Sequence, residues 1–84
     1  MGLGGDKGTM SYNGHRNWNH WNVSLWIGND EGLYHLAREC KRRAKTVRNA
    51  AEDMLQLLND AGINKTPDGA PYTKSAIRAA MSGL

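Results

Sequence analysis

The sequence predicts an all-α fold: a small bundle of a short tryptophan-rich helix, a long central helix and a short C-terminal helix, preceded by a flexible N-terminal arm. Apolar residues after residue 30 recur about every 3.6 positions, which is the period of one helical face. Residues that favour helix N-caps precede each of these segments. A length of 84 residues also leaves room for only one hydrophobic core.

The first sixteen residues differ in composition from the rest of the chain. They contain five glycines, almost no aliphatic side chains and no periodic pattern. Such a segment buries too little apolar surface to offset the entropy lost on ordering it. We therefore expect a flexible arm over residues 1–16 and a single helical domain over residues 17–84.

The tryptophan-rich segment spans residues 17–27 and is apolar on two sides of a helix. One side carries Trp18, Trp21 and Leu25, and the other carries Val23, Trp26 and Ile27. Because an 84-residue chain without phenylalanine needs large side chains for its core, we expect the indole rings to fill that core. Trp18, nearest the arm, is the one ring that we expect to remain a contact residue. Asn17 is the expected N-cap and Gly28 the expected end of this helix.

The region from residue 31 to residue 61 carries the clearest period in the sequence. Its apolar stripe consists of Leu33, Leu36, Ala37, Cys40, Ala44, Val47, Ala51, Met54, Leu55 and Leu58. No Gly or Pro interrupts the pattern between Leu33 and Ala61, so it fits either one long helix or two helices with a break near residues 44–46. We favour one long helix, although about thirty residues at 1.5 Å each would exceed the width of so small a domain.

The residue pattern in the last third of the chain predicts a helix end, a turn and a short helix. Gly62 suits a left-handed helix C-cap, and residues 66–69 read Thr-Pro-Asp-Gly, the pattern of a type I turn. A final helix is expected from Lys74, with Thr73 as its cap and Ile77, Ala80, Met81 and Leu84 on its inner face.

Composition excludes several classes of protein. Cys40 is the single cysteine, so an intramolecular disulfide is impossible and a reducing cytoplasm fits best. No apolar run is long enough to cross a bilayer, and we expect no membrane association.

Catalytic and metal-binding patterns are also missing from the sequence. His15, His20, His35 and Cys40 lack the spacing of a zinc site, and Cys40 falls on the apolar stripe, where it is expected in the core. Neighbouring Glu52 and Asp53 point in different directions on a helix, and no activated nucleophile is apparent. We therefore expect a non-enzymatic protein without a cofactor or metal.

A basic cluster is the strongest functional signal. It consists of Arg38, Lys41, Arg42, Arg43, Lys45 and Arg48, most of them on one face of the predicted long helix. Such a face can follow a phosphate backbone. Equally, it can be a solvated face supported by pairs of opposite charge from Glu39 to Arg43 and from Arg48 to Glu52. The net charge of +3 favours an anionic partner without requiring one.

Two resemblances to known families add to this interpretation. The block from Asn17 to Tyr34, with Trp-Asn-Val-x-Leu-Trp over residues 21–26, and the later Thr-Pro-Asp-Gly resemble a group of small uncharacterised proteins of bacteriophages and mobile elements. That resemblance covers about a third of the chain and implies a phage or prophage origin.

The second resemblance lies in the C-terminal third. Residues 58–63, then Thr66, Pro67, Gly69, Tyr72, Thr73, Ile77 and Arg78, are similar to the segment of large serine recombinases in which a helix, a Thr-Pro-x-Gly turn and a second helix contribute to DNA binding. This similarity adds Lys74 and Arg78 to the candidate contacts. Asp68, however, stands where the recombinases commonly carry a basic residue, and their catalytic domain is absent.

The leading hypothesis from the sequence is a phage or mobile-element accessory protein that binds nucleic acid through its basic helix face, helped by Lys74 and Arg78. The alternative is a counter-defence protein that inhibits a host nucleic-acid-processing complex, of the CRISPR or restriction type, by protein–protein binding. A structural virion component is a third possibility.

Overall fold

The computed structural model describes residues 17–84, and the predicted flexible arm over residues 1–16 lies outside the described residues. Four helices make up the fold: α1 (Trp18–Asn29), α2 (Glu31–Arg43), α3 (Val47–Asp60) and α4 (Lys74–Met81). Apart from one isolated β-bridge between Lys65 and Pro71, the described residues form no β-structure. The predicted all-α fold is thus confirmed.

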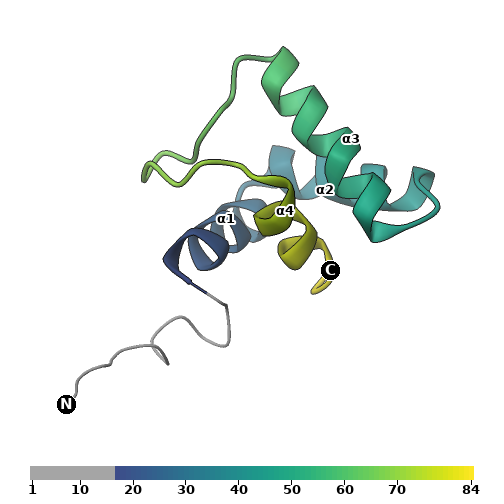
Figure 1. The fold of residues 1–84 in the computed structure, drawn as a ribbon, viewed down its shortest axis with the longest axis horizontal. Coiled ribbons are helices and arrows are strands. Elements are labelled where there is room, and N and C mark those ends of the chain that lie inside the picture. Colours follow the sequence, from purple (N-terminus) through teal and green to yellow (C-terminus); the bar gives the residue numbers. More distant parts are fainter. Residues whose placement is uncertain (1–16) are drawn as a thin grey trace.

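The short helix α4 lies between α1 and α3, and α2 packs against both α1 and α3 (Figure 1). All four helices share one core. Its buried members are Val23, Ile27, Ala37, Cys40, Ala50, Ala51, Met54, Leu58, Ala70, Tyr72, Ala76, Ile77, Ala80 and Met81. Cys40, Ile77, Ala80 and Met81 are buried as the sequence predicts, whereas Leu84 lies beyond the end of α4 and is half-buried.

Of the two alternatives for residues 31–61, the favoured single long helix is wrong and the break near residues 44–46 is confirmed, because the chain forms α2 and α3. Ala44 has extended backbone angles, and the Thr46 side chain accepts a hydrogen bond from the Asn49 amide as the N-cap of α3. No Gly or Pro is needed, since a capping hydroxyl satisfies the first amides of a new helix. Folding α3 back onto α2 buries the apolar stripe of each helix against the other.

The expectation that the tryptophan rings fill the core is also wrong. Trp21 and Trp26 are only half-buried, and α1 instead contributes His20, Asn22, Val23 and Ile27 to the interior. Trp18, the ring predicted to remain a contact residue outside the core, is 40% exposed. Six alanines line the core, so the helices approach closely and leave space for side chains of medium size. The indoles consequently lie at the edges of the helix packing.

The helix ends follow local rules that the sequence carries. Asn17, Asp30 and Thr73 each accept a hydrogen bond from the backbone amide three residues ahead and so cap α1, α2 and α4. Gly28, by contrast, does not end α1, which continues through it to Asn29. The caps of α1 and α4 are those predicted.

Helix α3 ends in a left-handed glycine cap, as predicted. Gly62 has a φ of +78°, its amide donates to the Asn59 carbonyl, and the Ile63 amide donates to the Leu58 carbonyl. This pair of bonds is the Schellman motif, which satisfies carbonyls at the end of a helix. Residues 61–73 then form the connection between α3 and α4.

The connection is tied to α1 through the predicted turn. The Gly69 amide donates to the Thr66 carbonyl at 2.8 Å, which closes the turn. Asp68 Oδ2 accepts hydrogen bonds from Asn22 Nδ2 and Trp26 Nε1, both at 2.9 Å. Thr66 Oγ1 donates to Asn22 Oδ1 at 2.6 Å and accepts from the Ala70 amide. These side chains form a network, which we call the Asp68 network, between two segments more than forty residues apart in the sequence.

Removing the amide at the centre of the Asp68 network should destabilise the fold. Asn22 is 2% exposed and uses both its amide nitrogen and its oxygen. Asn22→Ala leaves the buried Thr66 hydroxyl without this acceptor, so we expect the free energy of unfolding to fall by about 1 to 3 kcal/mol. Chemical denaturation measures this change. Asn29→Ala, at an exposed position on the same helix, should change the free energy of unfolding by less than about 0.5 kcal/mol. Equal effects of Asn22→Ala and Asn29→Ala would contradict the role of the network.

Asp68 should also make stability depend on acid pH. Hydrogen bonds from Asn22 and then Trp26 hold the pKa of Asp68 below its usual value. The carboxylate therefore adds stability above about pH 4, near the pKa of an unfolded aspartate, and this contribution is lost as the pH falls through the lower folded value. Between about pH 5 and pH 2, the melting temperature of the parent protein should fall further than that of Asp68→Asn. If the melting temperatures of the parent and of Asp68→Asn fell by the same amount over this range, this role of Asp68 would be refuted.

Candidate nucleic-acid interface

The basic cluster predicted from the sequence does not lie on one helix face. Helix α2 ends at Arg43, Lys45 lies in the connection to α3, and Arg48 belongs to the first turn of α3. The change of chain direction at residues 44–46 separates these side chains into two groups. The predicted continuous stripe from Arg38 to Arg48 is therefore corrected to one group on α2 and another around the start of α3.

The second group meets the basic residues of α4. Arg48 from α3 and Lys74 and Arg78 from α4 line one hollow with a volume of about 550 Å³. Ser75, Ala79 and Ser82 complete its lining. We call this the α3–α4 hollow. It joins cations that lie in separate segments of the sequence.

The charge in the α3–α4 hollow is only partly balanced. Lys74 Nζ lies 3.0 Å from Glu52 Oε2, and its hydrogen bond and charge lower the pKa of that carboxyl group. Arg48 and Arg78 make no ion pair with another described residue and are exposed. Three cations thus face one carboxylate, and the hollow attracts anions.

Two serine hydroxyls in the hollow were not among the residues predicted from the sequence. Ser75 Oγ lies 2.9 Å from Nε2 of the buried His20, which fixes the hydroxyl between α1 and α4. Ser82 Oγ donates to the Arg78 carbonyl at 3.0 Å. The sequence gives no signal for Ser75, because its partner His20 lies 55 residues away, and the bond from Ser82 to Arg78 is local but does not reveal the hollow.

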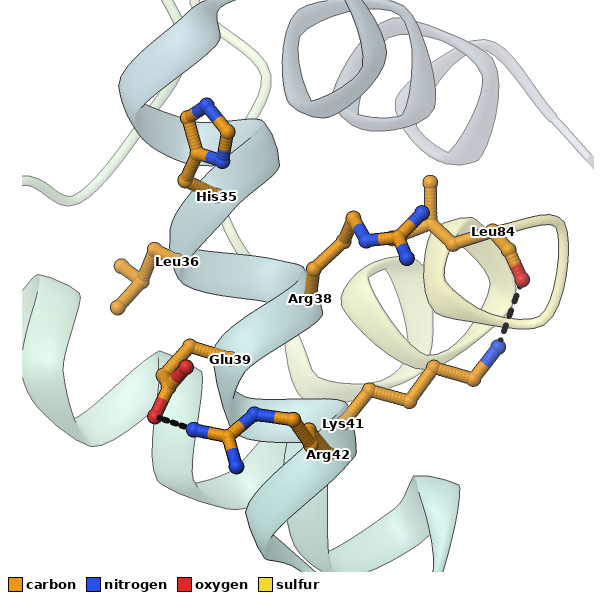
Figure 2. Close-up of a pocket in the computed structure, with 7 residues that line it drawn as sticks. All are labelled: His35, Leu36, Arg38, Glu39, Lys41, Arg42 and Leu84. Atoms are coloured by element: carbon orange, nitrogen blue, oxygen red, sulfur yellow. Dashed lines mark hydrogen bonds and ion pairs between the residues drawn. The ribbon is translucent and has the colours of Figure 1, made fainter.

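The first basic group borders a second hollow, here called the α2 hollow, with a volume of about 780 Å³. Its lining consists of His35, Leu36, Arg38, Glu39, Lys41, Arg42 and Leu84. Figure 2 shows Arg38 and Lys41 extending from α2 toward Leu84, whereas Arg42 turns toward Glu39. Leu84 lines the α2 hollow and Ser82 lines the α3–α4 hollow. Both hollows thus adjoin the C-terminal end of α4.

Several cations of the first group have partners within the protein. Lys41 Nζ donates to the carbonyls of Met81 and Leu84, both at 2.9 Å, and so caps the C-terminal end of α4. Arg42 and Arg43 both pair with Glu39, whose pKa is lowered chiefly by the hydrogen bond from Arg42. The same bond raises the pKa of Arg42.

Arg38 has an aromatic neighbour instead of a carboxylate. Its guanidinium carbon lies 5.6 Å from the centre of the Tyr34 ring, and its Nη1 donates to the Tyr34 hydroxyl at 3.0 Å. These contacts restrain the side chain while leaving its charge uncompensated. Arg38 is therefore the most available cation of the α2 hollow.

Other candidate sites are less developed in the part of the chain that the structure describes. No group of three or more His, Cys, Asp or Glu side chains there could hold a metal ion, and His15 lies outside this part. No helix in residues 17–84 is both long and apolar enough to cross a membrane. Trp18 does not line either basic hollow.

Comparison with known proteins gives a family but no activity. No curated protein and no solved structure matches the chain. A family model, described as a family of unknown function (DUF7249), matches residues 8–83, which include all four helices, the Asp68 network and both hollows except Leu84. The chain therefore belongs to the DUF7249 family of unknown function.

Proposed function

We propose that this protein binds nucleic acid without catalysing a reaction, and that the α3–α4 hollow holds the phosphate backbone. The observation that carries the proposal is the convergence of Arg48, Lys74 and Arg78 with two serine hydroxyls in one hollow. Charged and hydroxyl donors of this kind make most protein contacts to phosphate and sugar oxygens.

The residues of the hollow suit a phosphodiester. An arginine guanidinium presents parallel N–H groups to two phosphate oxygens. Arg78 makes no ion pair with a described carboxylate, and Arg48 acts on Glu52 through its charge without forming an ion pair. Lys74 adds a point charge, held in place by Glu52. Ser75 and Ser82 complete the polar wall of the hollow, with their hydroxyl groups hydrogen-bonded to His20 and to the Arg78 carbonyl.

The α2 hollow provides an extension of this interface. Arg38 contributes an uncompensated charge on the other side of the α4 end, whereas Glu39 offsets the charge of Arg42 and Arg43. We include Lys45 because it is exposed between the two groups. Phosphate contacts carry no base information, so we expect binding that is strongly salt-dependent and largely independent of sequence.

The biological setting of the proposal rests on the resemblance to small phage proteins. The Trp-Asn-Val-x-Leu-Trp and Thr-Pro-Asp-Gly motifs support an accessory role for a phage or mobile element, acting in the host cytoplasm. A counter-defence protein that binds a host complex is the alternative. A pull-down from nuclease-treated host lysate separates the two: a single retained protein complex supports the inhibitor, and loss of all partners supports nucleic acid.

Neutralising the two open arginines should weaken binding to duplex DNA. For Arg48→Gln/Arg78→Gln we expect the salt dependence of log Kd to decrease by about one unit for each phosphate that the variant can no longer neutralise, together with weaker binding at low salt. Arg42→Gln/Arg43→Gln removes the same number of charges from two cations that already pair with Glu39, and it is the matched control, with a smaller expected loss of affinity. Fluorescence anisotropy with a labelled duplex at several salt concentrations measures both quantities.

Two outcomes of this titration would contradict the proposal. One is the absence of salt-sensitive binding by the parent protein at low ionic strength. The other is an equal loss of affinity in Arg48→Gln/Arg78→Gln and in Arg42→Gln/Arg43→Gln, which would mean that only net charge matters. Circular dichroism shows whether each variant is folded.

The ion pairs also predict a ranking among the arginines. Arg42→Gln should reduce DNA affinity less than Arg48→Gln, because Glu39 already offsets the charge of Arg42. The difference should be on the order of several-fold at low salt. A larger loss of affinity in Arg42→Gln than in Arg48→Gln would mean that the main interface lies on α2 and not in the α3–α4 hollow.

A further inference from the structure

An apolar groove lies at the other end of α3 from Arg48. The end of α1, the start of α2, the last turns of α3 and the connection after it form its walls, and its volume is about 530 Å³. Large apolar side chains line it, among them Trp26, Leu33, Leu36, Leu58 and Tyr72. We call this the apolar groove. Neither basic hollow includes it, apart from Leu36 at the boundary.

Apolar side chains also project at the edge of the groove. Leu57 is 48% exposed and Ile63 is 40% exposed, and both belong to its lining. Exposed apolar side chains next to an apolar groove are typical of a protein contact surface. The same face therefore offers both projections and a groove that can receive them.

The charges of the groove are complementary to one another. Asp30 and Lys65 both line it, and no described carboxylate pairs with Lys65. In a dimer with two-fold symmetry, the contact of one residue with a second is repeated with the roles of the copies exchanged. A carboxylate and an ammonium group on one face can thus form two intermolecular ion pairs.

We propose that the apolar groove is the interface of a symmetric homodimer. Leu57 and Ile63 of each copy pack into the groove of the other, and Asp30 of each copy pairs with Lys65 of the other. The partner is a second copy of this chain, since both halves of the complementary surface are present on one molecule.

The groove is small for a protein interface, and interfaces of this size are typical of weak or transient complexes. Twelve residues line it, whereas a standard interface involves about 20 to 30 residues on each side. A dissociation constant in the micromolar range, on the order of 1 to 100 µM, is therefore expected. The protein would change between monomer and dimer with concentration.

The dimer would leave the α3–α4 hollow accessible. Leu57 and Arg48 are nine residues apart on α3, which places them about 14 Å apart along the helix axis. Each dimer would carry two separate basic hollows, and joining two binding sites raises apparent affinity for a long anionic partner. The dimer itself does not rest on the proposed nucleic-acid binding.

Analytical ultracentrifugation of the whole chain without nucleic acid tests the proposal. The parent protein should shift from monomer to dimer between about 1 µM and 1 mM. Leu57→Glu places a charge on the apolar face and should raise the dimer Kd at least about tenfold, a loss of about 1.4 kcal/mol. Asn59→Glu introduces the same charge at an exposed position of α3 outside the groove and should dimerise like the parent.

A charge reversal and its rescue give a second test of the dimer that changes no apolar residue. Lys65→Glu should weaken the dimer by placing like charges together, and Asp30→Asn in that background should restore part of the affinity. Asparagine at residue 30 can still cap α2, so the helix is retained.

The possible results separate this proposal from the nucleic-acid proposal. A parent protein that stays monomeric to about 1 mM, or a Leu57→Glu variant that dimerises like the parent, overturns the homodimer. Growth beyond a dimer overturns the two-fold arrangement. A monomeric parent that still binds DNA in the salt titration would refute only the dimer, and a dimer without DNA binding would refute only the nucleic-acid function.

Discussion

The hydrogen bonds that Asp68 accepts from Asn22 and Trp26 join the connection after α3 to α1, two segments that are far apart in the sequence. The connection over residues 61–73 contains no helix, and a segment of this length needs contacts to define its path. The Asp68 network fixes it against α1, and α4 begins directly after it, between α1 and α3. The position of α4 in turn places Lys74 and Arg78 opposite Arg48. The same connection supplies Ile63 and Lys65 to the apolar groove, so both candidate surfaces depend on one network.

The network also gives a physical reason for the two motifs to occur together. Asn22 and Trp26 belong to the tryptophan-rich motif, and Thr66 and Asp68 belong to the Thr-Pro-Asp-Gly turn. Asn22 and Thr66 are both buried, so a change at either one leaves a buried polar group of the other motif without this partner, which is costly. The motifs are therefore explained by the requirements of folding. Asp68 serves to hold the connection against α1.

The basic residues divide according to what the fold requires of them. Lys41 donates to backbone carbonyls at the end of α4, and Arg42 and Arg43 share the carboxylate of Glu39. These three cations stabilise helix ends or offset charge on α2. Arg38, Arg48 and Arg78 have no carboxylate partner among the described residues, and Arg48 and Arg78 share a hollow with two hydroxyls. A count of positive charges along the sequence does not distinguish these groups, because the distinction depends on which acceptors lie within reach.

The sequence by itself determined the features that depend on neighbouring residues. Asn17, Thr73 and Gly62 mark helix ends because capping uses atoms within three or four residues, and the period of the apolar stripe places Cys40, Met54 and Leu58 in the core. The tertiary structure decided the break at residues 44–46, since the gain from packing α2 on α3 is a long-range effect that the local pattern left open. It also decided that the indole rings lie at the edge of an alanine-lined core, and that Arg48 meets Lys74 and Arg78, because both outcomes follow from how the helices approach one another.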